Sequence, residues 1–172
     1  MRPATAIAGI IATKYQMNVA GVEDFVAGLF TGLIHKNDLP LIQACLKNTG
    51  ALEAEITNAL SDISKGDIPD ILKGVQEMGQ IIKELPTDLA GCKDVAADVQ
   101  KIEAWGAIFS EPVKLIPTLA ENLIHNWSKV AGDVSKVNTD YKGANYENVG
   151  EDVADILIES VGPIGEVLMS LY

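Results

Sequence analysis

Aromatic residues, cysteines and histidines are scarce in this chain of 172 residues. Aromatics make up 5% of it, and there are two cysteines and two histidines. A core must therefore be built mainly from Leu, Ile, Val and Ala. Two cysteines are too few for a disulfide scaffold, so apolar burial has to stabilise the fold. The longest apolar stretch is well below the ~18 residues that a membrane-spanning helix needs, so we expect no transmembrane segment.

Motifs that carry catalytic chemistry are also missing. The chain has no Gly-x-Ser-x-Gly elbow, no Gly-Lys-Ser/Thr phosphate loop and no EF-hand spacing of oxygen ligands. His35 and His125 each stand alone, without Cys, Asp or Glu at the spacing of a zinc site. We therefore expect no catalytic residue, no cofactor and no specific metal site, and a protein that is not an enzyme.

Acidic residues outnumber basic ones, giving a formal net charge of −11 and a pI near 4.5. Nucleic acid and anionic membrane surfaces repel such a protein, so neither is an expected partner. Two groups of carboxylates stand out in the sequence: Glu147, Glu151, Asp152 and Asp155, and Asp94 with Asp98. We interpret both as solvated helix faces, where calcium could collect as a diffuse counterion.

Apolar residues recur at helical spacing along most of the chain, and no segment alternates with a period of two. Asn18, Asp38 and Asp67 are expected helix N-caps. Lys65-Gly66 and Lys142-Gly143 are expected helix ends. The pattern predicts an all-α, single-domain bundle of about seven to nine helices with short connections.

Several turn signals divide the predicted helices. Asn48-Thr49-Gly50 is expected to end one helix, Pro86 to break another before a new helix begins at Thr87, and Pro117 to kink or restart a third. Gly28 and Gly32, four residues apart, predict a helix that another helix approaches closely. Gly162-Pro163 is expected to begin a last helix.

The N-terminal segment has two interpretations. Residues 1–18 combine Arg2 with a short apolar run, as in a short N-terminal helix or a weak signal-like segment. Residues 19–172 form the expected single helical domain.

One apolar seam extends over the longest helical pattern. Leu119, Leu123, Trp127, Val130, Val134, Val137 and Tyr141 recur at spacings of 4, 4, 3, 4, 3 and 4. This spacing is typical of a coiled-coil-like seam, and we interpret it as a candidate interaction surface. The sequon Asn126-Trp127-Ser128 lies within it, and we attribute that sequon to chance.

The two cysteines can pair or remain free. A bond between Cys45 and Cys92 would close a loop of about 48 residues, worth roughly 4 kcal/mol in the chain-entropy model. Buried free thiols are equally compatible with the residues, because cysteine packs as a small hydrophobe.

Several short stretches, in their order and spacing, resemble a family of small, two-cysteine, all-helical secreted proteins of ciliated protozoa. They are Phe25-Val26-Ala27-Gly28-Leu29, Leu89-Ala90-Gly91-Cys92, Ile102-Glu103-Ala104-Trp105, Ser110-Glu111-Pro112, Asp140-Tyr141-Lys142-Gly143-Ala144-Asn145-Tyr146-Glu147 and Gly150-Glu151-Asp152. The resemblance implies secretion or storage in secretory vesicles, an oxidised Cys45–Cys92 pair and no assigned enzymatic activity.

The sequence thus favours a non-catalytic structural or interaction protein, extracellular or in a secretory vesicle, that associates with itself or with a protein partner through helix faces. A carrier of lipids or other apolar small molecules is the alternative, since such helices can enclose a dry cavity. A cytoplasmic protein is the alternative for the location.

Overall fold

The computed structural model describes residues 16–162, and this part of the chain contains eight α-helices and no strand. The helices and two short 3₁₀ turns follow one another as α2 (Val19–Ile34), α3 (Leu39–Cys45), α4 (Thr49–Ser64), α5 (Ile68–Asp88), η1 (Lys93–Val95), α6 (Ala96–Gly106), η2 (Ala107–Ser110), α7 (Pro112–His125), α8 (Trp127–Lys142) and α9 (Tyr146–Val161). The predicted all-α fold is confirmed. The expectations for residues 1–14 and for a helix after Pro163 lie outside the described residues.

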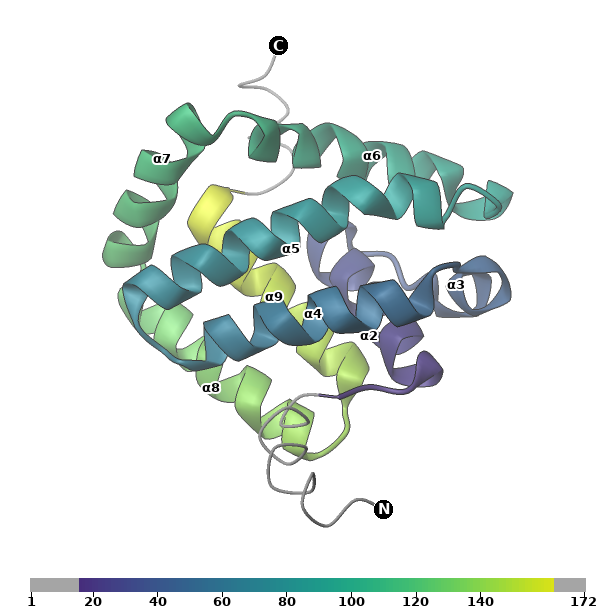
Figure 1. Ribbon diagram of the computed structural model, residues 1–172, viewed down its shortest axis with the longest axis horizontal. Helices are drawn as coiled ribbons and strands as arrows, with labels where there is room; N and C mark the ends of the chain where they lie inside the picture. Colours follow the sequence, from purple (N-terminus) through teal and green to yellow (C-terminus); the bar gives the residue numbers. More distant parts are fainter. Residues whose placement is uncertain (1–15, 163–172) are drawn as a thin grey trace, which may run out of the picture.

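The helices pack in two layers around a shared apolar core (Figure 1). The antiparallel pair α4 and α5 forms the front layer, and α2 and α9 cross behind it. α6, α7 and α8 enclose the sides, with α7 at the rim of the molecule. The largest fully buried side chains come from several helices and include Trp105, Phe25, Phe30 and Met78.

The closest helix crossing joins α2 to α9, and it confirms the prediction made from Gly28 and Gly32. A Cβ atom on Gly28 would overlap the backbone carbonyl oxygen of Glu147, and one on Gly32 would overlap the side chain of Ala154. Only a hydrogen at these positions lets the two helices approach so closely.

The expected caps are confirmed in part. The backbone N–H of Gly21 donates to Asn18 Oδ1 at 2.7 Å, and that of Asp70 donates to Asp67 Oδ1 at 2.9 Å. Asp38 precedes α3 as expected, but its side chain makes no capping hydrogen bond. Asn48 does not end a helix with Thr49 and Gly50: it precedes α4 with φ of 60°, and Thr49 and Gly50 form the first turn of that helix.

The expectation for Pro86 is wrong, and at Pro117 the chain does not restart. α5 continues through Pro86 to Asp88, so no new helix begins at Thr87. Pro86 lies in the last turn, where only one backbone hydrogen bond is lost and where buried Leu85 and Leu89 hold the chain against the core. α7 likewise continues through Pro117; the carbonyl that this proline leaves without a partner belongs to exposed Val113, where water can hydrate it.

Candidate functional site

Helix α7 has apolar residues on two adjoining faces. Leu115, Leu119 and Leu123 are buried against the core. The outer face carries Val113 at 88% exposure, Ile116 at 38% and Ile124 at 63%. These three are among the few large apolar side chains that the described part of the chain exposes, and the other two, Val19 and Leu41, lie on different helices.

The outer residues form a continuous stripe. At 100° per residue, Val113, Ile116, Pro117, Ala120 and Ile124 fall within about 100° of the α7 circumference. Isolated exposed apolar residues need no explanation, but a contiguous stripe marks a candidate contact surface. We call these five residues the α7 outer stripe.

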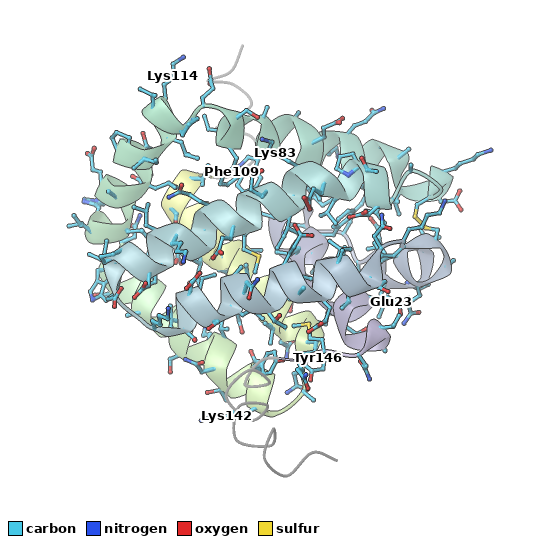
Figure 2. All side chains as sticks on the ribbon, viewed as in Figure 1. Glu23, Lys83, Phe109, Lys114, Lys142 and Tyr146 are labelled. Carbon is cyan, nitrogen blue, oxygen red and sulfur yellow. A yellow bond between two sulfur atoms is a disulfide. The ribbon has the colours of Figure 1, made fainter. Side chains whose placement is uncertain are left out.

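Two opposite charges lie on one flank of the α7 outer stripe. Lys114 and Glu121 are both exposed and, being seven residues apart, lie on the same side of the helix. Lys114 extends outward from the rim of the molecule (Figure 2). Its Nζ forms an ion pair with Oε1 of Glu111, the residue that precedes α7, at 3.6 Å. This ion pair is exposed, so Lys114 remains available to another partner at little cost.

The C-terminal end of α7 is fastened to α9. The side-chain amides of Asn122 and Asn126 donate to the backbone carbonyl oxygens of Ser160 and Glu159, at 2.8 Å and 3.1 Å. These bonds satisfy carbonyls in the last turn of α9, which have no partner within the helix. The α7 outer stripe is therefore presented on a fixed helix, and Asn126, the acceptor of the sequon, is engaged inside the protein.

The predicted seam from Leu119 to Tyr141 does not form one surface. The chain breaks at Asn126 between α7 and α8, so the seam is divided between two helices. Its members Leu119, Leu123, Val130, Val134 and Val137 are buried in the core of this chain, and Trp127 and Tyr141 are partly buried against it. The seam as an interaction surface was thus a wrong expectation, because regular apolar spacing shows that a face is buried without showing what buries it.

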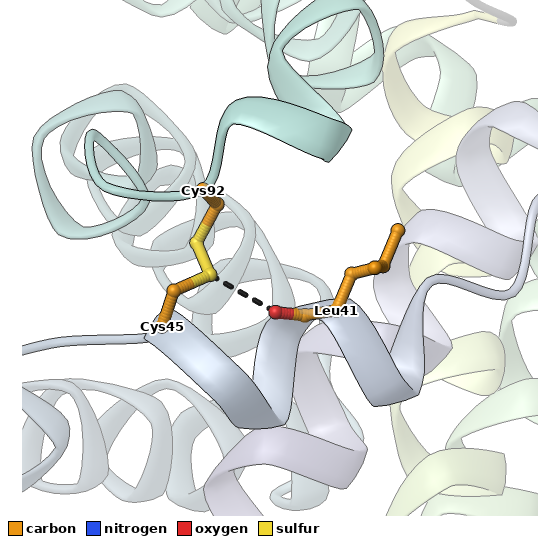
Figure 3. The surroundings of a disulfide bond; sticks show 3 residues. All are labelled: Leu41, Cys45 and Cys92. Atoms are coloured by element: carbon orange, nitrogen blue, oxygen red, sulfur yellow. Dashed lines mark hydrogen bonds between the residues drawn. A yellow bond between two sulfur atoms is a disulfide. The ribbon is translucent and has the colours of Figure 1, made fainter.

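Cys45 and Cys92 form a disulfide with a Cα–Cα distance of 5.5 Å (Figure 3). The bond joins the end of α3 to the turn before η1, and a hollow of about 390 Å³ next to it opens to solvent. Cys45 Sγ also approaches the carbonyl oxygen of Leu41 at 2.9 Å. A disulfide sulfur has no proton to donate, so this approach is a contact and not a hydrogen bond.

Carboxyl groups face other carboxyl groups across several helix interfaces. Between α8 and α9, Asp133 contacts Glu159 and Asp140 contacts Asp152. Two further contacts of the same kind link α4 to α5, Asp62 with Glu77 and Glu55 with Glu84. A fifth joins Asp38, before α3, to Asp98 on α6.

These contacts raise the pKa of one carboxyl in each pair. Burial, followed by the hydrogen bond and charge of the facing carboxyl, raises the pKa of Asp152 and of Glu159 to about 8. The same causes raise the pKa of Glu55 and of Glu77 to about 7, and that of Asp38 to about 6.

Lysines near these pairs lie at the solvent boundary. Lys65 and Lys73 approach Asp62 at 3.2 Å and 3.8 Å, and the hydrogen bond from Glu77, with help from these lysines, lowers the pKa of Asp62. Lys136 approaches Asp133 at 3.8 Å, and Lys36 approaches Asp98 at 3.6 Å. In every one of these ion pairs the lysine is more than half exposed and the aspartate is nearly buried.

The acidic groups of the sequence are therefore only partly solvated. Asp94 and Asp155 are exposed as expected, but Asp98 and Asp152 are 4% and 8% exposed, which corrects the expectation of wholly solvated faces. Asp133, also buried, was overlooked. Its sequence signal is its position beside Val130, Val134 and Val137 on the apolar face of α8.

The two histidines lie at helix ends. His35 follows α2 in the left-handed conformation with φ of 59°, and its backbone N–H donates to the carbonyl of Thr31. His125 is in the last turn of α7. Among residues 16–162, no group of three or more His, Cys, Asp or Glu residues is arranged to hold a metal ion. No described helix has the length and hydropathy needed to cross a bilayer.

The described fold defines a small all-helical protein linked by one disulfide. The profile of the SctB-like family, described as secreted protein B-like, matches residues 6–160, and the chain belongs to this family. The family supports the expected secreted class of protein; its description does not mention ciliated protozoa or two cysteines. No match was found among curated proteins or among solved structures.

Proposed function

We propose that this protein is a secreted, non-catalytic protein that acts by associating with a second copy of itself through the α7 outer stripe. The observation that carries the proposal is the exposure of Val113, Ile116 and Ile124 on one face of a helix whose adjoining face is buried. Family membership and the disulfide support an extracellular or vesicular location, since disulfides persist in oxidising compartments.

Charge complementarity favours an identical copy as the occupant. When two α7 helices pair antiparallel about a two-fold axis, residues on the same flank of the stripe face each other. Lys114 of one copy then lies opposite Glu121 of the other, and the symmetry repeats the contact. The two attractive pairs fix the register and oppose the repulsion between two chains of charge −11.

The size of the surface sets the strength of the association. Helix α7 has 14 residues and is therefore about 21 Å long. One such helix face gives an interface below about 1,200 Å², which is typical of weak complexes. We therefore expect a reversible dimer that forms at tens of micromolar protein or above. Salt screens the net repulsion and strengthens this dimer.

Sedimentation equilibrium over a range of protein concentrations tests the proposal. Val113→Glu places a carboxylate in the stripe and is expected to weaken dimerisation at least tenfold. Val19→Glu is the matched control, because Val19 is also exposed and also in the first turn of a helix, where the helix dipole favours a carboxylate. The control is expected to dimerise like the native chain.

Three results would contradict the proposal: a native chain that stays monomeric at high concentration, equal dimerisation of both variants, or a monomer that carries a lipid-sized adduct in native mass spectrometry. The adduct would favour the alternative function, a carrier of apolar small molecules.

A further inference from the structure

Six buried side-chain oxygens in the described part of the chain have no hydrogen-bond partner, and all six belong to carboxyl groups. They are Asp38 Oδ2, Glu77 Oε1, Asp98 Oδ1, Asp133 Oδ2, Asp152 Oδ2 and Glu159 Oε1. Each belongs to a carboxyl that faces another carboxyl from a different element. An ionised carboxylate can only accept, so two facing carboxylates leave both oxygens unsatisfied.

One proton per pair removes this defect. A protonated carboxyl donates its O–H to the facing carboxylate, which satisfies both oxygens and removes the like-charge repulsion. Without that proton, each pair keeps two negative charges in contact inside a helix interface. The arrangement is favourable in acid and costly once both groups are ionised.

We propose that four carboxyl pairs act as pH-dependent contacts between the elements they join: Asp38–Asp98, Asp62–Glu77, Asp133–Glu159 and Asp140–Asp152. Each pair stabilises its contact while one of its two carboxyls is protonated. Each pair holds a proton in mildly acidic surroundings and releases it toward neutral and alkaline pH. The fold is consequently most stable in mildly acidic solution. The α8–α9 interface has two of the pairs and loses the most stability as the pH rises. This inference is independent of the α7 outer stripe.

The charges that surround the α8–α9 pairs do not cancel the effect. The charged groups acting on Asp152 are Asp140, Asp133 and Lys136, all on α8. Those acting on Glu159 are Asp133 and Lys129 on α8 and Asp155 on α9 itself. In both sets two carboxylates raise the pKa and a single lysine lowers it, so the net effect raises it.

The surroundings of the other two pairs differ. Glu77 faces Asp62 with Lys73 and Lys65 nearby, and Asp38 faces Asp98 with Lys36 nearby. The hydrogen bond from Glu77 and the two lysines stabilise the Asp62 carboxylate, and Lys36 approaches Asp98 at 3.6 Å.

The sign of the pH effect follows from the raised pKa values. A carboxyl whose pKa is near 4 in the unfolded chain and about 7 or 8 in the folded one binds more protons when folded. Unfolding therefore releases protons between about pH 4 and pH 8. The contribution of such a carboxyl to the stability of the fold is complete below its pKa in the unfolded chain. It is lost as the pH rises through its pKa in the folded protein.

The native protein provides the first test. We expect unfolding at pH 6.5 to release about two to four protons, measured from the pH dependence of the free energy of unfolding in urea. We also expect the Tm to fall by at least about 10 °C between pH 5.5 and pH 8.5. The fall should persist in 0.5 M NaCl, which screens exposed charges far more than buried pairs. No proton release, proton uptake, or a fall that salt abolishes would overturn the proposal.

A double variant locates the effect at α8–α9. In Asp152→Asn with Glu159→Gln, each amide replaces the protonated carboxyl and donates to the facing carboxylate without titrating. We expect proton release to drop by about two and the Tm at pH 8.5 to rise. Asp94→Asn with Glu103→Gln removes the same charge from exposed sites and should release as many protons as the native chain. Equal release by both variants would overturn the assignment to these pairs.

Carbon-13 NMR of the native side-chain carboxyls keeps the test decisive if the double variant does not fold. Three or more carboxyls with titration midpoints above pH 6 would support the proposal, and none above pH 6 would overturn it.

Discussion

Gly28 on α2 and Gly150 on α9 bring two helix backbones into direct contact. A Cβ on Gly28 would lie 3.0 Å from Gly150 Cα, and a Cβ on Gly150 would lie 3.0 Å from the Gly28 carbonyl carbon. Such distances are tighter than nine in ten real Cβ contacts, and the atoms involved are backbone atoms that cannot rotate away. This contact fixes where α9 crosses α2, and α9 in turn carries the carboxyls facing α8 and the carbonyls bonded by Asn122 and Asn126.

Replacing Gly28 by Ala is expected to destabilise the protein by about 3 kcal/mol, because the methyl group must force two backbones apart. Gly132 is the matched control, since it also lies within a helix but a methyl group there would meet no side chain or neighbouring helix within 4 Å. Gly132→Ala should stabilise by up to ~1 kcal/mol through helix propensity. Urea unfolding followed by circular dichroism measures both; a Gly28→Ala variant as stable as the native chain would contradict the close crossing.

Removing the Cys45–Cys92 bond is expected to lower the stability of the fold by about 4 kcal/mol, because the unfolded chain regains the freedom of a long loop. The change is the double variant Cys45→Ser with Cys92→Ser. Thermal unfolding should show a Tm about 8–16 °C lower than that of the oxidised native protein. The native protein kept in reducing agent is the control, and its Tm should match that of the variant. An oxidised native protein with the same Tm as the variant would contradict the prediction.

Ala144 adopts a left-handed conformation with φ of 58° between α8 and α9. A Cβ is strained there and glycine is not, so Ala144→Gly is expected to stabilise the protein by about 1 kcal/mol. The same change at Ala131, an exposed position within α8, should instead destabilise by about 0.5–1 kcal/mol. Urea midpoints that shift in the same direction for both variants would show that the turn is not strained.

Asn126 is expected to carry no glycan in the secreted protein, because its side-chain amide donates to the carbonyl oxygen of Glu159. The intact mass of the protein from its own source measures this directly, and a sugar-sized increment that an amidase removes would contradict it. Asn126→Ala should also lower stability by about 1 kcal/mol through loss of that bond. Asn148→Ala, at an exposed position of α9, is the control and should change stability little.

Much of the fold could be predicted from local patterns. Apolar spacing predicted the helices, Asn18 and Asp67 predicted two caps, and Gly28 with Gly32 predicted a close helix crossing. Neither Pro86 nor Pro117 ends its helix, because the cost of a proline depends on which carbonyl it leaves unpaired. Pro86 lies in a last turn that the core holds in place, and Pro117 frees a carbonyl that water can reach.

The candidate surfaces were harder to predict. Leu119 and Val137 share a regular spacing, yet the chain turns at Asn126 and both side chains point into its own core. Val113 and Ile124 lie on a different face of α7 and were not part of that seam. Spacing along one helix identifies apolar faces, but which face is covered depends on the neighbouring helices.

By itself, the sequence determined the helical class, most helix boundaries, the acidic charge and the absence of catalytic motifs, since all of these depend on composition or on residues a few positions apart. Only the tertiary structure decided that Cys45 reaches Cys92, that Asp133 faces Glu159, and that Val113 and Ile124 on α7 are exposed. Such relationships join residues far apart in the chain, and helix packing, which no local pattern encodes, brings them together.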